Sequence, residues 1–335
     1  MYGCRWIFLA SFVACDPSLA EPQDVGPQSC PLDKAFLQPD EDGTQTRTVR
    51  YGTSSGYNFI GFYTDYKVNT DGAPESYAAI PAVPENTPRY NTIVNGVQLL
   101  DPQTRGVIAY GANGQDAILQ AVRTQGKRKW VRLAGEPIID WVGIEKSLVG
   151  GVVVPCRSGN YYVSKTTPAA RQMKPDGTPF AKCDQARWLN ANAIPAVVIP
   201  KKSRFIQLGA SPGDMAVSFL PAEPGVPEKL VFGIVGDVGP SQELGEATPA
   251  MIAVLSGKAI PEPSKLGKKG WNFSLPQKAY TLVITKSTSA FGGNFDDPQR
   301  NSLLVRQFFA QRWGDGSEAL AIAKLKACVS LAKLG

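Results

Sequence analysis

Short runs of β-branched and aromatic residues constrain the fold of this chain more than any other feature of its sequence. Five such runs lie at residues 151–155, 196–199, 204–208, 230–235 and 280–285, and most of them are closed by Pro, Gly or Asp. This composition is typical of strands. The runs lie too far apart to pair throughout as simple hairpins. The sequence therefore predicts a mainly β fold of the α+β class, with many turns supplied by 33 Gly and 27 Pro.

Two helices are predicted near the C-terminus. In the last one, Ser317 can act as the N-cap, and one face carries apolar side chains at helical spacing. These are Ala321, Leu325, Cys328 and Ala332. The segment 301–313 has a broad apolar stripe and ends before Gly314, as a second helix would.

The sequence contains no histidine among its 335 residues. This absence excludes Ser-His-Asp and Cys-His catalysis and zinc sites with His ligands. Acid–base chemistry could still use Lys, Tyr or a free Cys, but near neutral or acidic pH a pair of Asp or Glu carboxyls is the natural choice. We expect neither a metal nor a cofactor.

The N-terminus has the features of an export signal. Arg5 precedes the apolar run 6–14, which is too short to span a bilayer. Ser18 and Ala20 provide the small residues that a signal peptidase needs, so residues 1–20 are predicted to be a signal peptide. The alternative is lipid attachment at Cys15, although Phe12 stands where such sites usually have Leu. We expect a secreted or periplasmic protein without stable membrane insertion.

Four cysteines remain after this segment, namely Cys30, Cys156, Cys183 and Cys328. An even count in an exported protein predicts two disulfides, and four buried free thiols are the alternative. Three pairings are possible, and the sequence alone does not choose among them. The short intervening loop favours Cys156 with Cys183, which leaves Cys30 with Cys328.

The segment 230–248 carries the clearest signal for chemistry. An apolar strand leads through Gly236 to Asp237, and the turn-forming residues Gly239 and Pro240 follow. Glu246 adds a second carboxylate nine positions after Asp237. Glycosidic cleavage needs such a pair, one carboxyl to protonate the leaving oxygen and one to act on water or on the sugar. Spacing alone is weak evidence, because an Asp in such a turn commonly bonds its own backbone.

The two halves of this segment are Gly-Asp-Val-Gly-Pro at 236–240 and Glu-Leu-Gly-Glu-Ala-Thr at 243–248. Together they resemble the active-site signature of glycoside hydrolase family 75, the chitosanases. The resemblance implies that Asp237 and Glu246 are the catalytic pair of an inverting, endo-acting enzyme. We expect Glu246 to be the acid and Asp237 the base. Glu243, the rival for the second carboxylate, is then expected to contact substrate.

Further segments are similar to that family. They include Asn69-Thr-Asp-Gly-Ala followed by Tyr77, and the run from Trp188 to Pro200. The resemblance implies substrate contacts at Asp71, Tyr77 and Trp188, and it extends from about residue 57 to 313. It implies a single catalytic domain over 51–335, preceded by a loosely ordered segment 21–50 that Cys30 anchors. Val238 and the region 138–177 depart from the family pattern, which puts the substrate specificity in doubt.

The family fold implied by the resemblance is a mixed β-barrel with peripheral helices, for which a double-psi arrangement is one candidate. The expected partner is a β-1,4-linked glucosamine polymer, with no nucleic acid, and the protein is expected to be a monomer. Because the formal charge is +6 and chitosan is itself cationic, such an enzyme needs a locally acidic cleft. Asp65, Asp71 and Glu75 could supply it together with the pair and Glu243. The alternatives are a peptidoglycan hydrolase and a non-catalytic secreted carbohydrate-binding protein.

Overall fold

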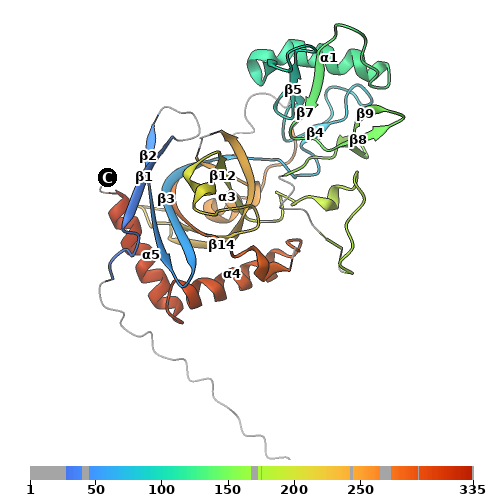
Figure 1. The fold of residues 1–335 in the computed structure, drawn as a ribbon. Coiled ribbons are helices and arrows are strands. Elements are labelled where there is room, and N and C mark those ends of the chain that lie inside the picture. Colours follow the sequence, from blue (N-terminus) through green and yellow to red (C-terminus); the bar gives the residue numbers. More distant parts are fainter. Residues whose placement is uncertain are drawn as a thin grey trace, which may run out of the picture.

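The computed structural model describes residues 28–39, 45–166, 173–174, 176–241, 244–264, 273–292 and 294–333 (Figure 1). The strands are β1 (Lys34–Pro39), β2 (Thr46–Ser54), β3 (Tyr57–Val68), β4 (Tyr77–Ala78), β5 (Val97–Leu100), β6 (Val107–Tyr110), β7 (Ile138–Trp141), β8 (Lys146–Val149), β9 (Val152–Pro155), β10 (Arg157–Ser158), β11 (Tyr161–Tyr162), β12 (Ala196–Lys201), β13 (Met215–Leu220), β14 (Lys229–Ser241), β15 (Glu246–Ala247) and β16 (Leu275–Ile284). The α-helices are α1 (Gln115–Lys127), α2 (Arg204–Gln207), α3 (Pro249–Ser256), α4 (Pro298–Arg312) and α5 (Glu318–Lys333).

A mixed β-barrel forms the body of the molecule. Its strands follow the order β3-β15-β12-β14-β13-β16, and β16 pairs with β3 to close the ring. The neighbours β12 and β14, and β15 and β3, are parallel, whereas the other pairs are antiparallel. β1 and β2 extend the sheet beyond the ring. The expected mainly β barrel with peripheral helices is confirmed, and its double-psi connectivity stays a prediction.

Strand side chains alternate between two apolar cores. On β13, Met215, Val217 and Phe219 belong to the cluster that also contains residues of α4 and α5, which places this cluster on the outer face of the barrel. On the same strand, Ala216 and Leu220 belong to a second cluster with Val197, Val235 and Val283, which fills the barrel interior. Strands with both faces covered by apolar side chains read as continuous hydrophobic runs, which is why the sequence pattern was visible.

The chain leaves the barrel after β3 and returns at β12. The intervening segment contains β4 to β11 and α1, which lie beside the barrel in Figure 1, and we call it the lobe. The lobe has its own hydrophobic core, in which Tyr77, Trp141 and Tyr162 are almost fully buried. The single domain predicted for residues 51–335 stays a prediction, and it contains these separate cores.

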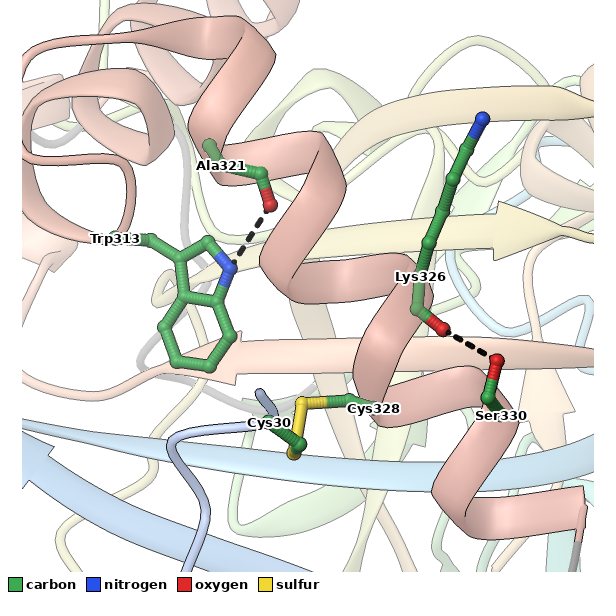
Figure 2. The surroundings of a disulfide bond; sticks show 6 residues. All are labelled: Cys30, Trp313, Ala321, Lys326, Cys328 and Ser330. Carbon is green, nitrogen blue, oxygen red and sulfur yellow. Dashed lines mark hydrogen bonds between the residues drawn. A yellow bond between two sulfur atoms is a disulfide. The ribbon is translucent and has the colours of Figure 1, made fainter. Parts of the chain in front are cut away.

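Two disulfides link parts of the described chain. Cys30 pairs with Cys328 and ties the segment before β1 to α5, as Figure 2 shows. Near this bond the indole Nε1 of Trp313 donates a hydrogen bond to the carbonyl of Ala321, at 3.1 Å, which attaches the end of α4 to α5. Cys156 pairs with Cys183 in the lobe. Both pairings match the favoured ones, and such bonds persist in oxidising compartments.

Most expected elements are present. The segments 151–155, 196–199, 230–235 and 280–285 largely coincide with β9, β12, β14 and β16, and the two C-terminal helices are α4 and α5. The strand expected at 204–208 is wrong. These residues form the short helix α2, in which Phe205 alone is buried and Gly209 follows with a positive φ of 89°, so one side chain is anchored and the turn ends at a left-handed glycine.

The first described strands begin within the segment 21–50. Part of the expected loosely ordered segment 21–50 forms β1 and the start of β2, which pair over their whole length. The predicted signal peptide and Cys15 lie outside the described residues. Among the residues described, no helix is long and apolar enough to cross a membrane.

Candidate active site

A β-bulge at Gly236 directs the side chain of Asp237. Along the parallel pair β12 and β14, Val197 is opposite Val235 and the next residue, Val198, is opposite Asp237, so Gly236 is the extra residue. A bulge reverses the alternation of side chains beyond it. Val235 and Val238 both contribute to the inner core, and Asp237 therefore points to the outer face of the barrel.

Asp237 and Glu246 lie in one row across neighbouring strands. Val198 of β12 lies opposite Asp237 on one side, and the antiparallel register of Val197 with Ala247 places Glu246 opposite Val198 on the other. Because Ala247 belongs to the inner core, Glu246 points outward like Asp237. Two strand spacings separate their Cα positions by roughly 9 to 10 Å. Both residues are partly exposed.

Glu246 is held from two sides. The side-chain amide of Asn69 donates a hydrogen bond to its Oε2, at 3.0 Å. On the other side lies Gly239, where a Cβ would stand 3.2 Å from Oε2 and 2.9 Å from a methyl of Val198. A larger residue at 239 would crowd this carboxylate, so the glycine and the amide together define where Oε2 lies.

Asp71 lies at the base of the lobe, in the turn after β3. Its backbone N–H donates to the Oδ1 of Asn69, at 2.9 Å, so Asn69 contacts both Asp71 and Glu246. The hydroxyl of Tyr77 donates to the Oδ1 of Asp71, at 2.5 Å. The glycine next to each aspartate packs against Leu189. A Cβ on Gly72 would lie 2.1 Å from the carbonyl oxygen of Leu189, and a Cβ on Gly236 would lie 2.8 Å from the Cδ2 of Leu189. Leu189 therefore joins the turn of Asp71 to the bulge before Asp237.

The three carboxyls interact electrostatically. Burial above all, together with the charges of Asp237 and Glu246, raises the pKa of Asp71 to about 8, and the Tyr77 hydrogen bond and Lys165 oppose this shift. Burial also raises the pKa of Tyr77, as does the charge of Asp71. A carboxyl with a pKa this high is protonated at neutral pH. Such shifts are common at functional sites.

Not every predicted site residue lies in this arrangement. Glu243 lies outside the described residues. Trp188 is 2 % exposed and packs with Val163 against the disulfide of Cys156 and Cys183. Its ring therefore belongs to a small core, and this burial argues against stacking on a sugar. Tyr77 is also fully buried, so its place is beneath Asp71 and not against a ligand.

The predicted acidic cleft is only partly assembled. Asp71 lies with the pair, but Asp65 forms an ion pair with Arg47, at 3.4 Å between Nη2 and Oδ1. Glu75 lies near Tyr90 and Tyr161, whose pKa values are raised chiefly by burial and further by the charge of Glu75. Within the described ranges, no cluster of three His, Cys, Asp or Glu side chains has the spacing to hold a metal ion.

Two positioning residues were not singled out from the sequence. Asn69 was visible only as part of the Asn-Thr-Asp-Gly motif. Lys165 comes from the region 138–177, which departs from the family pattern, and its ammonium donates to the carbonyl of Trp141 at 3.1 Å. The sequence around Lys165 does not indicate that this residue lies near the candidate site, because its position there depends on how the lobe packs on the barrel.

A pocket on another part of the molecule has a different character. An apolar pocket of about 590 Å³ lies between β14, α3 and α4. Its lining includes Phe232, Val254, Leu303 and Arg306, and Arg306 is engaged with Glu318 at 2.8 Å. The lining residues that the structure describes include no Asp or Glu.

No protein-family model and no curated protein matches this chain. The likeness to family 75 therefore rests on the short motifs, of which Asp237, Glu246 and Asp71 are brought together at the outer face of the barrel.

Proposed function

We propose that this protein is a secreted glycoside hydrolase that cleaves β-1,4-linked glucosamine polymers with Asp237 and Glu246. The observation that carries the proposal is the row of Asp237, Val198 and Glu246 on one face of the barrel. Two carboxyls in such a row can act on opposite sides of a sugar that lies across β12. The two disulfides support export, because they form in oxidising compartments.

The resemblance to family 75 implies an inverting mechanism. In inverting enzymes the two carboxyl groups are roughly 6.5 to 9.5 Å apart, which leaves room for a water, whereas in retaining enzymes they are roughly 5 to 5.5 Å apart. The Cα positions of the pair are two strand spacings apart, roughly 9 to 10 Å, and the resemblance to family 75 implies the longer carboxyl separation. In this mechanism Glu246 protonates the leaving oxygen, Asp237 removes a proton from the attacking water, and both carboxyls return to their starting states after product leaves.

A panel of polymers tests this proposal. The wild-type protein and the variants Asp237→Asn and Glu246→Gln are incubated with highly deacetylated chitosan, chitin and peptidoglycan, and new reducing ends are measured. We expect release from chitosan by the wild type and a loss of at least about a hundredfold in each variant, since general acid–base catalysis contributes roughly 10²- to 10⁴-fold.

The panel also separates the alternatives. Reducing ends from peptidoglycan but not from chitosan would indicate a cell-wall hydrolase with the same chemistry. Binding of a polymer without release by any protein of the set, with affinities that both substitutions leave intact, would indicate a carbohydrate-binding protein and contradict the proposal.

A further inference from the structure

The turn that carries Asp71 is rigidly built. The N–H of Asp71 bonds to Asn69 at 2.9 Å, and the N–H of Gly72 donates to the hydroxyl of Ser164 at 3.0 Å. Ser164 is fully buried. Gly72 has a positive φ of 92° and lies too close to Leu189 for any larger side chain. The backbone on both sides of Asp71 is thus fixed by the lobe and by the segment that leads to β12.

One oxygen of Asp71 is already engaged. Its Oδ1 accepts the hydroxyl of Tyr77 at 2.5 Å, and a Cβ on Gly143 would stand 3.1 Å from the same oxygen and 2.8 Å from that hydroxyl. Backbone of the lobe therefore covers Oδ1. Oδ1 accepts the hydrogen bond from Tyr77 and is therefore poorly placed to carry a proton itself. When the Asp71 carboxyl is protonated, the proton belongs on Oδ2.

The charges around Asp71 come from several elements. Asp237 of β14 and Glu246 of β15 each raise the pKa of Asp71 when they are ionised, Tyr77 of β4 is a neutral donor, and Lys165 after β11 is the nearby cation. Lys165 is itself shared with Glu145 and Asp140, and burial lowers its pKa. Carboxylates on one face repel one another, so the enclosed Asp71 keeps its proton to a higher pH than a solvated carboxyl would.

We propose, on the basis of the proposed hydrolase function, that Asp71 is a third functional carboxyl, which stays protonated at neutral pH and donates a hydrogen bond from Oδ2 to a sugar oxygen of the substrate. Tyr77 is its positioning residue. The burial and the two charged neighbours that raise the pKa of Asp71 to about 8 support this assignment. Asp71 is then a neutral donor that orients the sugar between Asp237 and Glu246, and it forms no salt bridge with a substrate ammonium.

Protonation can be tested without any substrate. With ¹³C-labelled aspartate, NMR should show one carboxyl carbon with a titration midpoint near 8, absent in Asp71→Asn. Tyr77→Phe should raise this midpoint, since it removes a hydrogen bond that favours the ionised form, and Asp237→Asn should lower it by removing a like charge. The exposed Asp116→Asn is the control, and it should leave the signal unchanged. A midpoint of Asp71 near 4 would overturn the proposal.

Stability provides a second readout that is independent of activity. A carboxyl with a raised pKa in the folded state destabilises that state as pH rises from about 4 to 8, because the unfolded chain loses the proton first. Asp71→Asn should therefore raise the urea midpoint at pH 8 relative to the wild type by more than it does at pH 4. An equal effect at both pH values would contradict a retained proton.

Activity tests the contact with substrate. Asparagine keeps a donor at this position, so Asp71→Asn should lose no more than about tenfold in kcat/KM at pH 6, whereas Asp71→Ala should lose about a hundredfold, a loss typical of a missing donor. Wild-type activity should also decline through pH 8, and this decline should be absent in Asp71→Asn. Equal, large losses in both variants would show that the carboxylate is required and overturn the donor role. A wild type without activity on any polymer would remove the proposed function and this contact, while the NMR midpoint still decides the protonation.

Discussion

At the scale of single residues, the site depends on where Oε2 of Glu246 lies. Asn69 donates to this oxygen, and Gly239 leaves the space that it occupies. The pair itself could be predicted from the sequence, because Asp237 and Glu246 belong to a contiguous motif. Asn69 and Gly239 were visible only as members of motifs, and what each does follows from the fold, which brings β3, β14 and β15 together.

Gly239→Ala should lower activity without unfolding the protein. The added methyl would lie 3.2 Å from Oε2 of Glu246 and 2.9 Å from Val198, so the carboxylate must shift from its place in the row. A displacement of this size can cost about a hundredfold in rate. Gly106→Ala is the matched control, because its nearest neighbour would be 3.4 Å away. Full activity of Gly239→Ala would show that the place of Oε2 is unimportant.

Asn69→Asp should weaken catalysis through charge. The new carboxylate can still accept from the N–H of Asp71, but it replaces the donor 3.0 Å from Glu246 with a like charge. A hydrogen bond to a charged group is worth about 1.5 to 3 kcal/mol, so kcat/KM should fall by roughly 10- to 150-fold. Asn294→Asp makes the same change in a remote turn, where Oδ1 accepts the N–H of Asp296 at 3.1 Å. Comparable losses in both variants would point to general destabilisation instead.

At the scale of elements, the strands were predictable where both faces are buried, since β12, β14 and β16 each contain a continuous apolar stretch. The strand prediction at 204–208 was wrong because α2 is short and buries only Phe205. Its few apolar residues do not show the spacing of a helix. α1 and α3 were not predicted. α3 is almost entirely apolar, with five of its eight residues buried, and a short buried helix cannot be distinguished from a buried strand by periodicity. The bulge at Gly236 also follows from pairing that the local sequence does not specify.

Removal of the bond between Cys30 and Cys328 should loosen α5 from the barrel. The double variant Cys30→Ala/Cys328→Ala should lose about 2 to 5 kcal/mol in the free energy of unfolding, because the bond restricts the unfolded chain. Urea unfolding followed by circular dichroism measures the loss. The wild type in reductant is the control and should approach the variant, and equal stability of the oxidised wild type and the variant would contradict this account.

Both disulfides should be complete in the purified protein. Alkylation without reductant, followed by mass spectrometry, should find Cys30, Cys156, Cys183 and Cys328 unmodified. Modification of all four would show that the thiols are free and would remove the support for an oxidising compartment.

At the scale of the whole molecule, the charge of +6 and the proposed cationic substrate oppose each other. The acidic groups at the site must therefore outweigh the distant basic ones. Distant charges are screened within about 8 to 10 Å at physiological salt, whereas Asp237 and Glu246 act on substrate at contact range.

Added salt should accordingly slow the reaction if attraction at the site governs capture. We expect kcat/KM on highly deacetylated chitosan to fall as sodium chloride increases from 20 to about 500 mM, because screening weakens the attraction of a cationic chain to the carboxylates. A neutral, N-acetylated oligomer serves as the control and should show a weaker dependence. An increase of kcat/KM with salt would mean that repulsion by the whole protein dominates.

The anomeric configuration of the first product tests the central claim most directly. A β-1,4-linked glucosamine hexamer is mixed with the protein, and proton NMR spectra are recorded before mutarotation equilibrates the product. The inverting mechanism proposed for Asp237 and Glu246 predicts that the α-anomer appears first. Initial formation of the β-anomer, or no cleavage at any pH between 4 and 8, would contradict the account.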